Sequence, residues 1–446
     1  MSVPIAPRSY VAAASAIAGG SDNPRAFLER CLDSIDAHEK DVLAFVHLDI
    51  ESARKSADAS AARWRAGKQL SPIDGMPVGV KDVIETVDMP TGMGSPLFAG
   101  VRSGRDAASV KALRQAGAVI VGKTVTTEFA ASVPGPTRNP HDLRRTPGGS
   151  SSGSAAGSAA GFFSVGLGTQ VVGSIVRPAG FCGVVGFKPS LGAINRGGSH
   201  DFMSQSSQGA LGASLADVWA ALIEIANRCG GDPGWPGLAG PVPQPVAKAP
   251  RALVVLETPG WPKVSAGLKV DFDAVVDKLA KAGVKIVSRK QSPAVEAVEK
   301  AIEQALPLTR DINGWESIWP LNIYRDRDAE KLSRDMREKL AEAEKMTPDD
   351  YRRALAARDL MRQAYAALAD IADGCVTLSA PGPAPIGLGH TGDPAFVVAG
   401  SALGVPALTL PLLREQGLPV GVQLMGFAQR DAEAVAVAAW INALGA

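Results

Sequence analysis

The chain has 446 residues, of which 46% are hydrophobic and 20% charged, a balance typical of a globular protein. Its 46 lysines and arginines nearly equal its 45 acidic residues, so a net charge of +1 provides no field that would attract nucleic acid or an anionic membrane. Four cysteines without a CxxC pair argue against a disulfide scaffold or a cysteine-rich zinc site, and the five histidines show no metal-ligand spacing.

The N-terminal segment lacks the basic stretch and apolar core of a signal peptide, and no uncharged run reaches the roughly 20 apolar residues of a membrane span. We therefore expect a cytoplasmic protein with neither a membrane nor a nucleic acid as partner. A short basic cluster, formed by Arg138, Arg144 and Arg145, is interpreted as a solvated loop.

Apolar residues at helical spacing predict helices over 24–40 and 50–67. The β-branched run 76–84 predicts a strand that ends near Lys81. A predicted helix over 106–118 then leads into a buried strand at 119–124. This alternation indicates α/β layering around a mostly internal sheet.

Glycines interrupt the apolar segment 162–190, which predicts short buried strands joined by tight turns. A helix is expected over 214–228, and the Pro- and Gly-rich stretch 230–250 is either a domain boundary or a long surface loop. A strand–helix–strand unit follows over 251–290, and residues 293–374 are expected to be almost wholly helical. Because strands occur at both ends and in the middle of the chain, one sheet built from distant segments is expected.

The stretch "TPGGSSSGSAAGSAAG" (146–161) has the composition of a flexible linker. It also contains a G-x-S-x-G pattern with Ser151 at its centre, as in a nucleophile elbow. That motif requires a preceding strand, whereas Pro147 and two glycines indicate a loop, and only His200 and His390 follow as candidate bases.

Two other motifs are incomplete or out of order. "SARK" (52–55) matches S-x-x-K of penicillin-recognising enzymes, but "SDN" (21–23) precedes it instead of following it and no K-T-G occurs. The Gly/Ser stretch 146–161 itself contains no G-x-x-x-x-G-K-[ST] pattern of a phosphate-binding P-loop. Neither motif therefore supports a function.

Several longer segments, taken together and in order, resemble the amidase signature family. They are "GMPVGVKDVI" around Lys81, "PGGSSSGSAA" from Pro147, "GTQVVGSIVRPAGFCGVVGFKPS" from Gly168 and "GLPVGVQLMG" from Gly417. The resemblance covers most of 70–200, the expected catalytic core segment, and most of 375–430.

The resemblance implies a catalytic triad in which Ser174 is the nucleophile, Ser150 the bridging serine after a cis peptide bond with Gly149, and Lys81 the base. The spacing of the two serines matches that of the family. The chemistry is sound on physical grounds, because a serine hydroxyl needs a base beside it and a lysine can replace the usual histidine. Apolar surroundings lower the pKa of a buried lysine, so that it can accept a proton near neutral pH.

The family takes its oxyanion donors from the backbone N–H groups of the turn before the nucleophile, here Val171, Val172, Gly173 and Ser174. Val171 and Val172 replace a threonine and a glycine of the common signature, and a valine is awkward where φ is positive. The geometry of this turn is therefore open.

Two residues are expected to support the site from behind. Gln170 replaces the common aspartate, which keeps hydrogen bonding but loses charge. Ser151 is expected to act in the same supporting way, although a purely structural role is an equal alternative.

Arg177, three residues after Ser174, resembles an arginine of the malonamidase-like branch that can face an acidic substrate group. The alternative is an internal salt bridge that supports the loop.

The resemblance implies one α/β domain over 1–446, with a mixed, mostly parallel sheet of about eleven strands between helical layers. Residues 293–374 are expected to cover the pocket and to shape specificity. The expected function is that of an amidohydrolase that cleaves C–N bonds of small amides through an acyl-enzyme. The resemblance implies neither a cofactor nor a metal, and it suggests a homodimer. The alternatives are the amidase component of a glutamine-dependent amidotransferase and a catalytically decayed scaffold.

Overall fold

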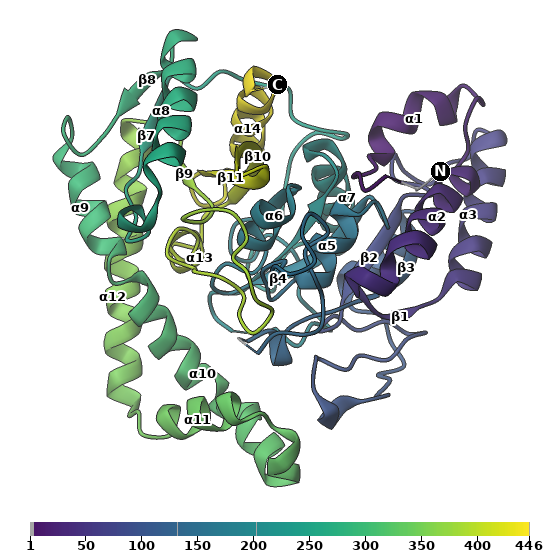
Figure 1. Cartoon of the computed structure of the whole chain (residues 1–446), viewed down its shortest axis with the longest axis horizontal. Helices are drawn as coiled ribbons and strands as arrows, with labels where there is room; N and C mark the ends of the chain where they lie inside the picture. Colours follow the sequence, from purple (N-terminus) through teal and green to yellow (C-terminus); the bar gives the residue numbers. More distant parts are fainter. Residues whose placement is uncertain (1–3, 132, 202, 446) are drawn as a thin grey trace.

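The computed structural model describes residues 4–131, 133–201 and 203–445. One sheet of eleven strands runs through the molecule in the order β1-β3-β2-β4-β6-β5-β10-β11-β9-β7-β8, with helices packed around it (Figure 1). Its strands are β1 Phe45–Leu48, β2 Pro77–Lys81, β3 Val119–Thr124, β4 Val165–Gln170, β5 Val185–Lys188, β6 Ser207–Gly212, β7 Ala252–Val255, β8 Lys285–Val287, β9 Cys375–Leu378, β10 Ala407–Glu415 and β11 Leu418–Met425. The expected mixed, eleven-stranded sheet is confirmed.

The expectation that the sheet is mostly parallel is wrong. Within the described residues only β2–β3, β2–β4, β7–β8 and β7–β9 pair in parallel, and the other six pairings are antiparallel. A parallel pair needs a long crossover, whereas β10 and β11 are joined by Gln416 and Gly417 alone, both with positive φ. Such a two-residue turn produces a hairpin.

The helices are α1 Tyr10–Ala18, α2 Pro24–Val42, α3 Ile50–Arg65, α4 Ala108–Gln115, α5 Ser152–Ala159, α6 Val176–Cys182, α7 Leu215–Cys229, α8 Ala266–Lys281, α9 Pro293–Ile302, α10 Ala305–Asp328, α11 Arg334–Ala343, α12 Pro348–Ala366, α13 Val398–Ala402 and α14 Asp431–Gly445. Neighbouring residues of β6 show how they form two layers. Ala210 belongs to the apolar cluster that includes residues of α4, α7 and α14, whereas Leu211 packs with α5 and α6. Because successive strand residues point to opposite faces, these helix groups cover opposite sides of the sheet.

Helix α6 lies within 162–190, where the sequence predicts short strands and turns, and helix α5 lies in the Gly/Ser stretch, for which no helix is predicted. The small residues of α5 let it lie directly on the backbone of its neighbours. A Cβ at Gly153 would meet the carbonyl oxygen of Ala44 at 2.2 Å and the amide nitrogen of Val125 at 2.4 Å. The Gly/Ser stretch is therefore not a linker, because its glycines allow close packing behind the strands.

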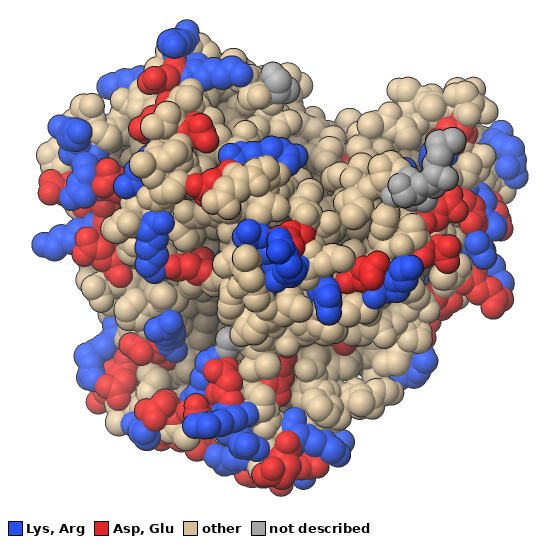
Figure 2. Space-filling view, viewed as in Figure 1, with Lys and Arg blue, Asp and Glu red and all other residues tan. Residues whose placement is uncertain are grey.

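The segment 293–374 is helical as expected, with α9 to α12 forming an arm along the left side of the molecule that ends at the lower left (Figure 1). Basic and acidic residues are interspersed over this arm and over the rest of the visible face (Figure 2). In the described part of the chain, no helix is long and apolar enough to cross a membrane. The stretch 230–250 contains no helix or strand.

Candidate active site

Lys81 ends β2, a strand whose five residues are all buried. Its Nζ lies 2.7 Å from Oγ of Ser150 and donates to Oγ1 of Thr169 at 2.8 Å. Burial lowers the pKa of this amine from 10.5 to about 7, and the carboxyl group of Asp201 opposes part of that shift. A large fraction of Lys81 is therefore neutral near pH 7 and able to accept a proton.

The cis peptide bond implied by the family resemblance is present between Gly149 and Ser150. Ser150 is buried, and its hydroxyl faces the amine of Lys81. A Cβ at Gly149 would come within 2.7 Å of Cγ2 of Thr391, so a glycine is needed for this close approach.

Ser174 lies in the turn between β4 and α6 and is 6% exposed. Its carbonyl oxygen accepts a hydrogen bond of 3.3 Å from the amide of Ser151, the residue after Ser150. The structure thus joins Lys81 directly to Ser150, and Ser174 to the same segment through the backbone. Among the described residues no hydrogen bond links the hydroxyl groups of Ser150 and Ser174, so the proton step between them stays a prediction.

The turn of residues 171–174 keeps its backbone donors free. Within the described chain, the N–H groups of Val171, Val172, Gly173 and Ser174 donate to no other group. Neither valine has positive φ, so the concern about valine strain at this turn does not apply. Packing requires a glycine at position 173, because a Cβ added there would lie 2.1 Å from Cγ2 of Val397.

Gln170 lies behind this turn. Its Oε1 accepts hydrogen bonds from the amides of Ile175 and Val176 at the start of α6, at 2.8 and 3.0 Å. Its Nε2 donates to Oγ of Ser401 at 3.0 Å. The side chain therefore connects the turn to α13.

Ser151 is fully buried, and its hydroxyl donates to the carbonyl of Thr169 at 3.4 Å. No strand leads into it, so the nucleophile-elbow alternative has no structural basis in this region. Its neighbour Ser152 likewise bonds a backbone carbonyl, that of Val125.

Arg177 is buried beside the site. Its Nη2 donates to the carbonyl of Gly149 at 2.8 Å and to Oγ1 of Thr391 at 3.0 Å. Among the described residues no carboxylate forms an ion pair with it, so the internal salt bridge is not found; Asp393 pairs instead with Lys263 at 2.5 Å. Burial lowers the pKa of Arg177 to about 10, which leaves it charged at neutral pH, and its buried Nε has no partner.

A family model described as Amidase matches residues 26–435. The chain belongs to the amidase family. It is 32% identical over 454 residues to a glutamyl-tRNA(Gln) amidotransferase subunit from Anaeromyxobacter sp. (strain K), a match that covers 93% of this chain and 91% of that protein. The corresponding protein of Chloroflexus aggregans is 38% identical over 241 residues, and that match spans 52% of this chain and about half (49%) of the relative. A crystal structure of an amidase superposes with a TM-score of 0.84 at 29% identity, covering 98% of this chain and 99% of that one.

Sequence reasoning missed several polar residues around Lys81, Ser150 and the 171–174 turn. Thr169 could have been found, because it lies at the end of β4, the parallel neighbour of β2. Gln205 and Ser401 offered no signal, since they come from the loop before β6 and from α13. Gln205 donates to the carbonyl of Val171 at 3.2 Å, and Ser401 to that of Val172 at 2.9 Å.

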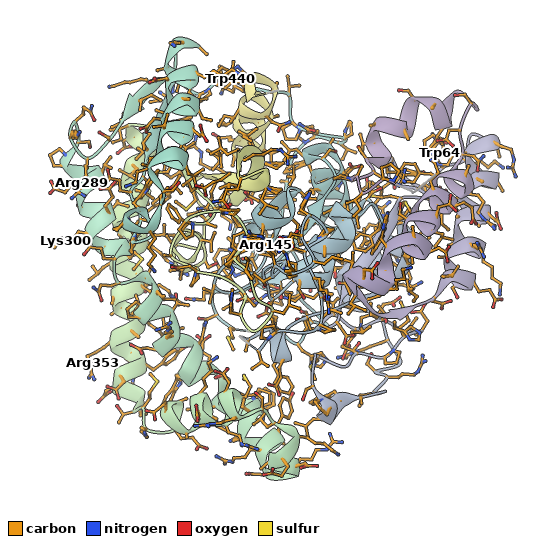
Figure 3. The ribbon with its side chains drawn as sticks, in the orientation of Figure 1. Trp64, Arg145, Arg289, Lys300, Arg353 and Trp440 are labelled. Carbon is orange, nitrogen blue, oxygen red and sulfur yellow. The ribbon has the colours of Figure 1, made fainter. Side chains whose placement is uncertain are left out.

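A second buried arginine, Arg358, comes from α12 in the helical arm. It donates to Oγ of Ser204 at 2.8 Å, one residue before Gln205, and its buried Nε has no partner in the described part of the chain. Arg353, one turn earlier, is exposed and lies on the outer side of the arm (Figure 3).

The basic cluster at 138–145 is not simply a solvated loop. Arg145, near the middle of the view in Figure 3, donates to the carbonyl of Ala384 at 2.6 Å and to Asp142 at 3.0 Å. Arg138 and Arg144 are exposed, with 77% of the Arg144 side chain accessible, whereas Arg145 is partly buried. Arg145 thus ties the segment before the Gly/Ser stretch to the segment after β9. No group of three or more His, Cys, Asp or Glu residues that could hold a metal occurs in the described regions.

Proposed function

We propose that this amidase hydrolyses small amides through a covalent acyl-enzyme on Ser174. The observation that carries the proposal is the buried Lys81, with a pKa of about 7, at hydrogen-bond distance from Ser150. A charged surface lysine would be no base at neutral pH, whereas this one has the protonation state that the reaction needs.

In the proposed reaction, Oγ of Ser174 attacks the amide carbonyl carbon while its proton passes to Ser150 and the proton of Ser150 passes to Nζ of Lys81. The carbonyl oxygen becomes an oxyanion, which accepts hydrogen bonds from the free N–H groups of the 171–174 turn. The C–N bond then breaks as the leaving nitrogen takes a proton back along the same route. Water attacks the acyl-enzyme in the same manner, releasing a carboxylate and freeing Ser174.

The substrate class that the charges favour is an amide that also carries a carboxylate. Arg177 is a buried cation whose Nε has no partner and which forms no ion pair in the described chain, and a guanidinium binds a carboxylate with two parallel hydrogen bonds. Arg358, which faces Ser204 from the helical arm, adds positive potential near the same turn. We propose that Arg177 contacts the substrate carboxylate and that 293–374 shapes specificity.

A second candidate function is that of an amidotransferase component which releases ammonia from glutamine for a partner. It is favoured by the identity of 32% to a glutamyl-tRNA(Gln) amidotransferase subunit over 93% of this chain. Rapid hydrolysis of free amides by the isolated chain would argue against this alternative.

The proposal is tested with a fluorophosphonate probe, followed by mass spectrometry of the labelled peptide. We expect one label, on Ser174, and turnover in a screen of amides led by half-amides of dicarboxylic acids. No label on Ser174 would refute the proposal and favour the decayed scaffold.

A further inference from the structure

Two consecutive peptide units of the turn after β4 are each held by a buried side chain. The carbonyl of Val171 accepts a hydrogen bond from Nε2 of Gln205, at 3.2 Å, and the carbonyl of Val172 accepts one from Oγ of Ser401, at 2.9 Å. Both donors are buried and come from segments that are distant in sequence, the loop before β6 and helix α13. The turn is thus held from two sides.

Fixing these carbonyls also fixes the N–H groups of the same peptide units. Both units are trans, so each N–H points away from its own carbonyl. Gln205 therefore sets the direction of the Val172 N–H, and Ser401 sets that of the Gly173 N–H. Neither N–H has an acceptor among the described residues, so both remain available to a ligand.

The hydrogen bonds around Ser401 have a defined direction. Oε1 of Gln170 accepts from the amides of Ile175 and Val176, which turns Nε2 of Gln170 toward Ser401. The hydroxyl of Ser401 accepts from Gln170, and its own proton is then directed to the carbonyl of Val172. A carboxylate at position 170 could not donate, and it would compete with Val172 for the serine proton.

We propose that Gln205 and Ser401 are positioning residues that aim the N–H groups of Val172 and Gly173 at the oxyanion formed during amide cleavage, with Gln170 setting the direction of the Ser401 hydroxyl. The inference rests on the proposed function. Donors fixed before the reaction cost no reorganisation in the transition state, and a hydrogen bond to the carbonyl polarises the N–H of the same unit.

The test measures the rate constant of fluorophosphonate labelling at Ser174 in Ser401→Ala, Gln170→Glu and the double variant. We expect each single variant to label about tenfold more slowly, a smaller loss than that caused by removal of an oxyanion donor. The double variant should be no slower than the singles, because both changes break one chain of hydrogen bonds. Ser60→Ala is the matched control, since it removes a buried hydroxyl on α3, away from α13 (Figure 1).

Gln205→Glu tests the peptide unit between Val171 and Val172. It provides an independent test if Ser401→Ala fails to fold. In each folded variant, affinity for phenylboronic acid, which forms a tetrahedral adduct with Ser174, should fall by the same factor as the labelling rate. In Ser401→Ala, which adds no charge, the pH midpoint of labelling should stay unchanged, because Lys81 and the charges around it are untouched. Labelling within twofold of wild type in all these variants would overturn this inference alone. Absence of labelling in the wild-type protein would instead refute the proposed function.

Discussion

Lys81 and Thr169 meet at the carboxyl ends of two neighbouring parallel strands, with Nζ of Lys81 2.8 Å from Oγ1 of Thr169. The carbonyl of Thr169 also accepts from the same amine, at 3.3 Å. Thr169 thus orients the amine toward Ser150, and its two oxygen atoms are acceptors that favour the ammonium form. The amine of Lys81 is therefore held both by Thr169 at the end of β4 and by the hydroxyl of Ser150.

Thr169→Val should shift the pH dependence of Ser174 labelling to lower pH. In wild type the rate should rise with a midpoint near 7, the pKa to which burial lowers Lys81. Loss of the Thr169 hydroxyl removes an acceptor that stabilises the charged amine, so the pKa falls further. Thr377→Val, which alters a buried threonine on β9, is the control. A midpoint that moves to higher pH would contradict this role of Thr169.

Lys81→Met should abolish amide turnover and stabilise the fold at neutral pH. The folded-state pKa of Lys81 is about 7 and the ordinary value is 10.5, so below pH 7 the protein bears the full cost of a buried charge. That cost falls as the pH rises from 7 toward 10.5. The melting temperature of Lys81→Met should therefore exceed that of wild type at pH 7, by a margin that shrinks at higher pH. A margin that grows with pH would contradict the assignment.

Gly173→Ala should slow the labelling of Ser174 strongly, because the new Cβ would lie 2.1 Å from Cγ2 of Val397 and displace the turn. A second substitution, Val397→Ala, removes that atom and should restore part of the rate. Gly267→Ala in α8 is the control, since its Cβ meets nothing within 4 Å. A wild-type rate in Gly173→Ala would show that the turn does not need this close approach.

Arg177→Met should raise KM for an amide with a carboxylate relative to KM for its neutral counterpart. Loss of hydrogen bonds to a charged group costs about 1.5–3 kcal/mol, so a change of roughly 10- to 100-fold in this ratio is expected. Arg358→Met replaces the other buried arginine and should affect both substrates alike. If Arg358→Met changes the ratio and Arg177→Met does not, the anion site belongs to α12.

Sequence reasoning located strands and helices where apolar patterning was strong. The β-branched run before Lys81 and the strand 119–124 are β2 and β3. It missed α5, because glycine, serine and alanine carry no apolar period, and it missed α6, because Pro178 and Gly180 inside a short segment argue against a helix. It also overestimated parallel pairing, since strand direction depends on connections that composition does not reveal.

The site residues likewise fall into two groups, those that sequence motifs predict and those that only the fold brings together. Lys81, Ser150 and Ser174 lie in motifs that can be recognised from the sequence, and the structure brings the first two into contact. Gln205 and Ser401 contact the turn only because the loop before β6 and α13 fold against it. Such long-range contacts leave no local pattern in a single sequence.

The most direct test of the proposed mechanism is fluorophosphonate labelling of the wild-type protein and of Lys81→Ala at pH 8, with the labelled residue identified by mass spectrometry and the folding of both proteins checked by melting temperature. We predict one label on Ser174 in wild type and none in the folded variant. Equal labelling of Ser174 in both proteins, or a label on Ser151, would contradict the role of Lys81 as the base.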